Sequence, residues 1–321
     1  MSFLSYLISG ISLGSIYAII ALGYTMVYGI AKMLNFAHGD VIMIGAYVSY
    51  CVTSYLGLNP LLSVLAAVVV CTLLGIVIEG LAYKPLRNAS SLAVLITAIG
   101  VSYLLQNLAL LIWGSTPKSF HSVIDLPALK LFDGRLVITA EALVTIAACV
   151  VIMIALTLFT GKTKMGKAMR AVSEDKGAAQ LMGINVNRTI SLTFAIGSAL
   201  AAIAGAAQLM GINVNVTISL TFAIGSALAA IAGVLLCSMY PNLLPTTGSM
   251  PGIKAFTAAV FGGIGSIPGA MLGGILLGII ETFAKAYIST NLANAIVFAV
   301  LIVVLLVKPA GLLGKQIKEK V

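Results

Sequence analysis

The chain has 321 residues, of which 60% are hydrophobic and only 8% are charged, and its formal net charge is +9. Soluble domains carry roughly 25% charged residues, so the composition excludes a soluble globular protein and indicates an integral membrane protein. Its basic residues gather at the ends of apolar runs and in short loops, a pattern that sets membrane orientation rather than binding nucleic acid.

Apolar segments of bilayer-spanning length follow one another along the whole chain. They predict an all-α polytopic transmembrane helical bundle of about 8–10 membrane segments, some of them short or re-entrant, in a single transmembrane domain over residues 1–321. We expect the short segments 251–263 and 292–307 to be tilted, broken or re-entrant. The segments are 4–28, 40–57, 60–83, 91–113, 136–160, 189–207, 217–238, 251–263, 266–288 and 292–307.

The basic residues predict which ends of these segments face the cytoplasm, because short cytoplasmic loops are rich in Lys and Arg. The loop 161–188 and the C-terminal tail, which begins at Lys308, carry the largest basic excess. Lys32 and the pair Lys84 and Arg87 belong to the same side. The mixed-charge loop 114–135 then lies outside, as does the uncharged N-terminus.

The polar run Asn35 to Asp40 interrupts the first two apolar segments. Irregular backbone at membrane depth is tolerated only where it is buried in protein or lines a cavity. Asn35, His38 and Asp40 therefore either shape a translocation path or form a short cytoplasmic turn in which His38 and Asp40 cap the next helix. Both interpretations stay open at this stage.

Other polar groups lie inside apolar segments. Gln106 and Asn107 interrupt the 91–113 segment and either hydrogen-bond between helices or line the path. Glu281 and Lys285 are four residues apart on one predicted helix and can pair with each other. Glu79 lies near Lys84 at the cytoplasmic end of its segment, where its side chain can reach the membrane interface.

Within the basic loop 161–188, a short helix is predicted after Arg170. Glu174 and Asp175 favour its N-terminus through the helix dipole, and Gly183 suits its end. The segment contains the sequence Ala178-Ala179-Gln180-Leu181-Met182-Gly183. The basic loop 161–188 is the largest surface that the sequence offers to a soluble partner.

A 28-residue unit occurs twice in tandem: residues 177–204 repeat as 205–232, and Val216 stands where the first copy has Arg188. If both copies crossed the membrane, the basic tail would lie outside, against the orientation rule. We therefore predict that one copy does not make an independent full crossing.

Glycines four residues apart fill the stretch from Gly262 to Gly278. Such spacing favours close helix packing. The alternative is a half-helix break near the midplane, in which the backbone around Gly262, Gly263 and Gly265 meets the substrate. The spacing of a phosphate-binding loop is absent, so no ATP site is expected in this chain.

Several short patterns together resemble one known family over nearly the whole chain. Ala178-Ala179 and Gly183 resemble the coupling motif of ABC importer permeases, although Gly177 stands where that motif begins with Glu. The runs Asn35–Asp40, Lys84–Arg87, Gly183–Asn185 and Gly252–Ala270 resemble those of branched-chain amino acid permeases of the LivH type. Their order and spacing are more specific than any one of them.

This resemblance implies a permease subunit in the cytoplasmic (inner) membrane of a bacterium, moving leucine, isoleucine and valine by alternating access. It implies a second homologous permease subunit, two ATP-binding subunits that carry the ATP and Mg²⁺, and an external solute-binding protein, with membrane lipid around the bundle. Arg170, Glu174, Asp175, Ala178, Ala179 and Gly183 would form the coupling loop. No catalytic residue, metal site or cofactor is expected in this chain.

Other functions remain open from the sequence. An importer for urea, short amides or other amino acids would use the same architecture. A secondary transporter or channel would need paired intramembrane carboxylates or a polar stripe, and would work without ATPases. An intramembrane enzyme would need a nucleophile and a base on facing helices, and His38 has no such companion in the sequence.

Overall fold

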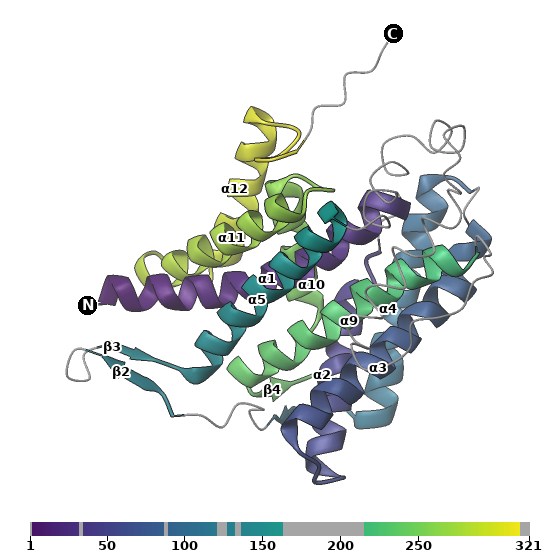
Figure 1. Ribbon diagram of the computed structural model, residues 1–321, viewed down its shortest axis with the longest axis horizontal. Helices are drawn as coiled ribbons and strands as arrows, with labels where there is room; N and C mark the ends of the chain where they lie inside the picture. The colour runs from purple at the N-terminus through teal and green to yellow at the C-terminus, as the bar shows by residue number, and fades with distance from the viewer. Residues whose placement is uncertain are drawn as a thin grey trace.

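In the computed structural model, α-helices form a membrane bundle around a long central helix, α1 (Figure 1). The structure describes residues 2–31, 35–86, 89–120, 127–131, 136–162 and 215–314. The helices are α1 (Ser2–Ala31), α2 (His38–Ser54), α3 (Pro60–Ile78), α4 (Ser91–Trp113), α5 (Ala140–Lys162), α9 (Asn215–Met239), α10 (Ser249–Gly262), α11 (Ile267–Tyr287) and α12 (Ala293–Val307), with a π-helix η1 (Glu79–Tyr83) and a 3-10 helix η2 (Lys84–Leu86) after α3.

The strands are short and join loops. β1 (Lys118–Ser119) pairs antiparallel with β4 (Asn242–Leu243), and β2 (Leu129–Leu131) pairs antiparallel with β3 (Leu136–Ile138). The sequence did not predict them, because each is only two or three residues long. Five of the described helices, namely α1, α3 with η1, α4, α5 and α11, are long and apolar enough to cross a membrane. This confirms a polytopic helical membrane protein.

Local sequence determines where several helices begin. The Asn59 side chain accepts a hydrogen bond of 2.9 Å from the Leu61 N–H, and Pro60 opens α3. Ser90 caps α4 and Ser266 caps α11 in the same manner, through the N–H groups of Ala93 and Gly269. Such caps satisfy donors that a helix end leaves without an internal partner.

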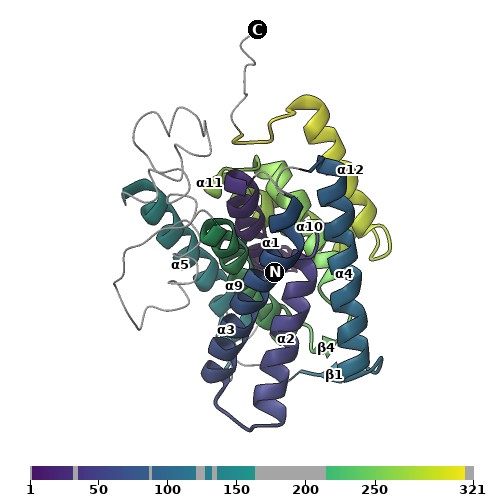
Figure 2. The ribbon, with the colours of Figure 1, turned by 90° about the vertical axis from the view of Figure 1, so that its right-hand side faces the viewer.

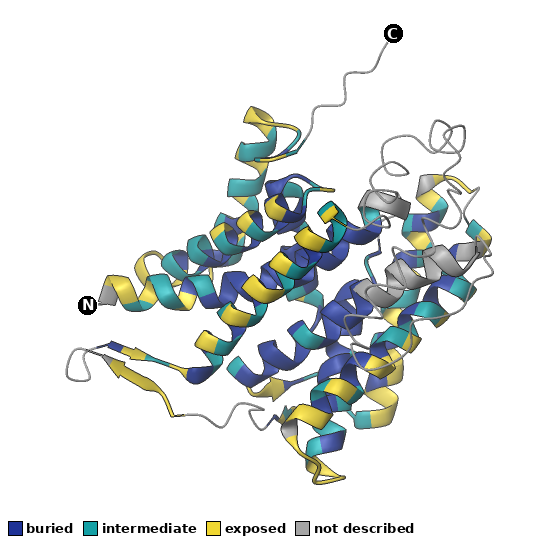
Figure 3. Cartoon of the chain, in the orientation of Figure 1, coloured by how far each residue is buried: buried dark blue, intermediate teal, exposed yellow. Residues whose placement is uncertain are grey.

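The buried residues concentrate in α1, α2, α9 and α10, whereas α3, α4, α5 and α12 present exposed apolar side chains outward (Figure 3). In lipid, such outward faces need no cover. Cys71, Cys149 and Cys237 are buried and Cys51 is half-buried.

Glycines bring α11 against α1 in an antiparallel pair. A Cβ atom added to Gly274 would lie 2.4 Å from the backbone N of Ala18, and one added to Gly278 would lie 2.2 Å from the Cα of Gly14. Only residues without a side chain allow such an approach. Gly273 lies in the same way against the backbone of α10. This supports the packing interpretation of the glycine-rich stretch.

The helix directions show that α5 ends and α9 begins at the same end of the bundle (Figures 1 and 2). Ala142, near the start of α5, shares a pocket with Ser5 and Ser9, so α5 runs parallel to α1. The Ser12 hydroxyl lies 3.5 Å from the Met239 sulfur, whereas Gly225 lies against Val27, so α9 runs antiparallel to α1.

The start of the C-terminal tail lies at this same end. Leu312 and Leu313 donate backbone hydrogen bonds of 2.9 Å to Phe261 and Gly262, where α10 turns into α11. Lys162 and Lys308 therefore belong to one end of the bundle, which the orientation rule assigns to the cytoplasm. The loop 114–120, which pairs with β4 after α9, lies at the opposite end.

The second copy of the duplicated unit contributes residues 215–232 to α9, and its part 225–232 lies in the interior of the bundle. A Cβ atom on Gly225 would lie 3.3 Å from the His38 ring, and the Cβ of Gly45 would lie 2.6 Å from the Ala230 Cα. The first copy lies outside the described residues. That one copy makes no independent crossing therefore stays a prediction.

Candidate functional site

The first turns of α2 and α10 meet in the interior of the bundle. A Cβ atom on Gly39 would lie 2.7 Å from the Gly248 carbonyl oxygen, and one on Gly252 would lie 2.7 Å from the Gly39 Cα. Both helices begin beside the middle of α4, because Asp40 of α2 contacts Ser102 and Gln106, and Ser249 of α10 contacts Gln106. The 14 residues of α10 are too few to cross a bilayer, as expected for the 251–263 segment.

Asp40, in the first turn of α2, joins these elements through its carboxylate. The Gln106 side-chain amide donates a hydrogen bond of 2.9 Å to Asp40 Oδ1, and the Ser102 hydroxyl donates to Oδ2. Gln106 Nε2 also lies 3.3 Å from the Ser249 hydroxyl at the start of α10. Asp40 is 2% exposed. The cluster therefore links α2, α4 and α10 deep in the bundle.

This arrangement argues against a simple capping role for Asp40. The N-cap residue of α2 is Ala37, and no side chain caps that end. The Asp40 carboxylate turns to another helix instead. Asn35 likewise accepts a hydrogen bond of 2.9 Å from the Tyr83 hydroxyl of η1 and is buried. The polar run is thus an interior element rather than a solvated turn.

Aromatic rings line the neighbourhood of Asp40. Tyr24 of α1 contacts both His38 and Phe256, with ring centroids 4.6 and 5.7 Å apart, and Phe36 lies 5.5 Å from Phe256. Gly23 makes room for the His38 ring, since a Cβ atom there would lie 2.7 Å from Nε2. His38 is 1% exposed, and Nε2 has no hydrogen-bond partner among the described residues.

A second buried cluster lies between α1, α10 and α11. Glu281 Oε1 accepts from Lys254 at 2.7 Å and from Lys285 at 2.6 Å, and the Tyr17 hydroxyl donates to Oε2 at 2.8 Å. The pairing of Glu281 with Lys285 is confirmed. Lys254 was not foreseen as a partner, because it lies on a different helix. Glu79 is fully buried at the start of η1.

The structure places the predicted path residues in three locations. Asn35, His38, Asp40 and Gln106 come together around the start of α2. Asn107 lies on the exposed face of α4, where its amide donates to the Tyr103 carbonyl at 2.8 Å. Gly262, Gly263 and Gly265 lie at the turn from α10 to α11, away from the polar cluster. Gly263 and Gly265 adopt the positive φ angles of 106° and 92° that this turn requires.

The predicted coupling residues Arg170, Glu174, Asp175, Ala178, Ala179 and Gly183 lie outside the described residues. Several members of the polar cluster were not predicted from the sequence. Ser102 could have been found, because it precedes Gln106 by one helical turn on the predicted span. Ser249, Tyr24 and Tyr83 carry no such local signal.

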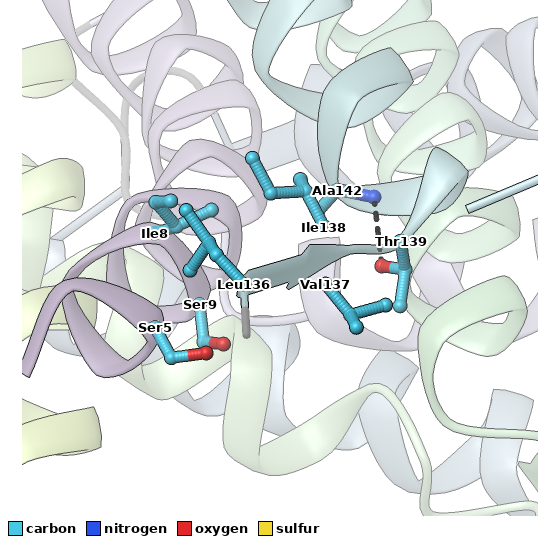
Figure 4. Close-up of a pocket in the computed structure, with 8 residues that line it drawn as sticks. All are labelled: Ser5, Ile8, Ser9, Leu136, Val137, Ile138, Thr139 and Ala142. Atoms are coloured by element: carbon cyan, nitrogen blue, oxygen red, sulfur yellow. Dashed lines mark hydrogen bonds between the residues drawn. The ribbon is translucent and has the colours of Figure 1, made fainter. Parts of the chain in front are cut away.

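A small pocket near the N-terminal end of α1 is not a substrate site. Its volume is about 50 Å³, enough for a water molecule or two. Figure 4 shows Ser5, Ile8 and Ser9 of α1 facing β3, with Thr139 accepting a hydrogen bond from the Ala142 N–H.

Comparison with known proteins gives a consistent result. The family model described as the branched-chain amino acid transport system permease component matches residues 6–209 and 205–305. The two matches overlap at the point where the second copy of the 28-residue unit begins.

Individual relatives are similar over nearly their whole length. The high-affinity branched-chain amino acid transport system permease protein LivH of Escherichia coli is 42% identical, over 99% of this chain and 98% of that protein. The corresponding permease protein BraD of Pseudomonas aeruginosa is 40% identical over the same shares. The probable LivH permease of Methanocaldococcus jannaschii is 29% identical, over 94% of this chain and 89% of that protein.

Proposed function

We propose that the chain is the membrane-spanning permease subunit of an ABC importer for leucine, isoleucine and valine in the bacterial inner membrane. The proposal follows from its family, because the chain belongs to the branched-chain amino acid transport permease components. The observation that carries the proposal is the 42% identity to a branched-chain amino acid permease over 99% of the chain. The helical bundle and its buried polar cluster fit this function.

Within this proposal, transport requires proteins outside the chain. Two ATP-binding subunits supply the energy, a second homologous permease subunit completes the translocation path, and an external binding protein delivers the amino acid. ATP and Mg²⁺ bind to the ATP-binding subunits.

The segment 161–188, which contains Arg170, Glu174 and Asp175, is proposed to receive the force of ATP hydrolysis. Its position between α5 and α9 supports this role. α5 ends and α9 begins on the cytoplasmic side, and both helices pack against α1, so a displacement of the segment reaches the centre of the bundle.

The polar cluster around Asp40 is proposed to lie along the translocation path. A free amino acid carries two charges and an apolar side chain, so a path through lipid needs polar groups for the former and an apolar wall for the latter. The start of α2 carries Asp40, which Gln106 holds, and His38, which packs on Tyr24 beside Phe256.

Charge reversal of Glu174 tests the proposal. In proteoliposomes that contain the complete complex, Glu174→Lys should leave ATP hydrolysis active and abolish most leucine uptake. Lys130→Glu, on the external hairpin, is the matched control and should keep both activities. Unchanged uptake in the Glu174 variant would contradict the coupling role.

A further inference from the structure

Two buried carboxylates of the bundle differ in how their charge is balanced. Glu281 contacts two ammonium groups, those of Lys254 and Lys285, and one hydroxyl. In the described residues, the side chains that donate to Asp40 are neutral, namely the Ser102 hydroxyl and the Gln106 amide. Among the described residues, no Lys or Arg forms an ion pair with Asp40. Within the part of the chain that the structure describes, the polar cluster therefore carries an acidic group without a paired cation.

The position of Asp40 makes this imbalance energetically important. Its partner Ser102 lies at the middle of α4, a helix that can span the membrane. A lone carboxylate is poorly stabilised at that depth, and intramembrane acids generally pair with a cation or mark the path of one. Neutral hydrogen bonds fix the orientation of the group but do not supply the missing positive charge.

The carboxylate also retains capacity for a further donor. An ionised carboxylate offers about four acceptor sites, and Ser102 and Gln106 each use one. A primary ammonium group carries several N–H donors and one positive charge, so it fits both the open acceptor sites and the missing charge.

We propose that Asp40 is the counter-charge for the α-ammonium group of the amino acid during its passage, an inference that rests on the proposed function. Tyr24, Phe36 and Phe256 provide the apolar surface for the side chain of the same molecule. Ser102 and Gln106 act as positioning residues, which hold the carboxylate in place between transport cycles.

In this structure Asp40 is closed off, so α4 must move for the ammonium group to reach it. α4 is suited to that movement, because it is the least enclosed of the five candidate spans. Only 17% of its apolar stretch is buried inside the bundle, less than in each of the other four. The polar cluster and the stacking of Trp113 on Tyr47, with ring centroids 4.3 Å apart, hold it against α2.

The test uses the complete complex in proteoliposomes, with leucine-loaded binding protein. Asp40→Asn keeps the size and polarity of the side chain and removes its charge, whereas Asp40→Glu keeps the charge. Ser49→Ala is the matched control on α2, since it removes only the interhelical Ser49–Ser63 hydrogen bond of 2.9 Å. Gel filtration confirms that each variant assembles.

We expect Asp40→Asn to reduce leucine uptake at least tenfold while ATP hydrolysis stimulated by the loaded binding protein stays within twofold of wild type. Asp40→Glu should retain clearly more uptake, and Ser49→Ala should match wild type. Normal uptake by Asp40→Asn would overturn the inference. Equal losses in the Asn and Glu variants, or a parallel loss of ATP hydrolysis, would also overturn it, because each indicates a structural role. If the wild-type complex took up no leucine, the proposed function itself would fail.

Discussion

Gly278 of α11 lies directly on Gly14 of α1, so closely that a Cβ atom on Gly278 would be 2.2 Å from the Gly14 Cα. The two helices form the central antiparallel pair of the bundle (Figure 1). Because the contact is between backbones, no side-chain rotation can relieve an added atom. This contact supports the position of Tyr17 and Glu281, one turn away on the same two helices.

The first prediction concerns this contact. Gly278→Ala should destabilise the protein by about 2–3 kcal/mol, the usual effect of overpacking a tight interior, because α1 and α11 must separate. Thermal unfolding of the detergent-solubilised protein measures the loss. Gly100→Ala on α4 is the control, since nothing lies within 4 Å of its added Cβ atom, and its stability should not fall. Equal stability of the two variants would contradict the packing.

The second prediction concerns the buried ion pair. Glu281→Leu should cost about 3–5 kcal/mol, because it leaves Lys254 charged and unpaired inside the bundle. Replacing both residues, with Lys254→Met added, should restore much of the stability, since an apolar pair needs no counter-charge. Unfolding midpoints of the single and double variants provide the measurement. A double variant less stable than the single one would show that the charges stabilise the bundle in another way.

The third prediction concerns membrane orientation. In a chain without native cysteines, Leu58→Cys should react with an impermeant maleimide added outside the cell. Lys162→Cys and Lys308→Cys should react only after the membrane is opened. This pattern follows from the shared position of the α5 end and the tail. Labelling of position 308 from outside would invert the topology.

The fourth prediction concerns the duplicated unit. Deleting residues 205–232 joins Ala204 to Gly233 and rebuilds the α9 sequence, with Gly197 and Ala202 in place of Gly225 and Ala230. The only change is Arg188 in place of Val216. The shortened chain should therefore assemble and take up leucine.

Deletion of residues 177–204 instead gives a matched chain that keeps Val216. Both shortened chains should behave alike in gel filtration and uptake. Loss of assembly in both would show that the duplicated unit is an integral part of the bundle.

Apolar length predicted most of the fold, because lipid leaves few alternatives to a helix. The segments 60–83, 91–113, 266–288 and 292–307 match α3 with η1, α4, α11 and α12 within a residue or two. The start of α2 was less predictable. Its polar residues suit a solvated turn as well as an interior contact. Asp40 and Ser102 are far apart in the sequence, so their contact is visible only in the folded structure.

Contacts between residues of different helices were also not predicted from the sequence. Glu281 and Lys285 are one turn apart on one helix, so their spacing indicated the pair. Lys254 reaches Glu281 only because glycines bring α10 and α11 together. Asn107 and Gln106 are adjacent in sequence, yet one faces outward and the other inward, since neighbouring residues on a helix point about 100° apart.

The most direct test of the proposed importer function is leucine uptake into proteoliposomes. All samples contain the purified chain, the second permease and the binding protein, and they are compared with and without the proposed ATP-binding subunits. Leucine uptake should require both the ATP-binding subunits and ATP hydrolysis, and it should stop with a non-hydrolysable nucleotide. Leucine uptake of equal rate without the ATP-binding subunits would contradict the proposed importer function.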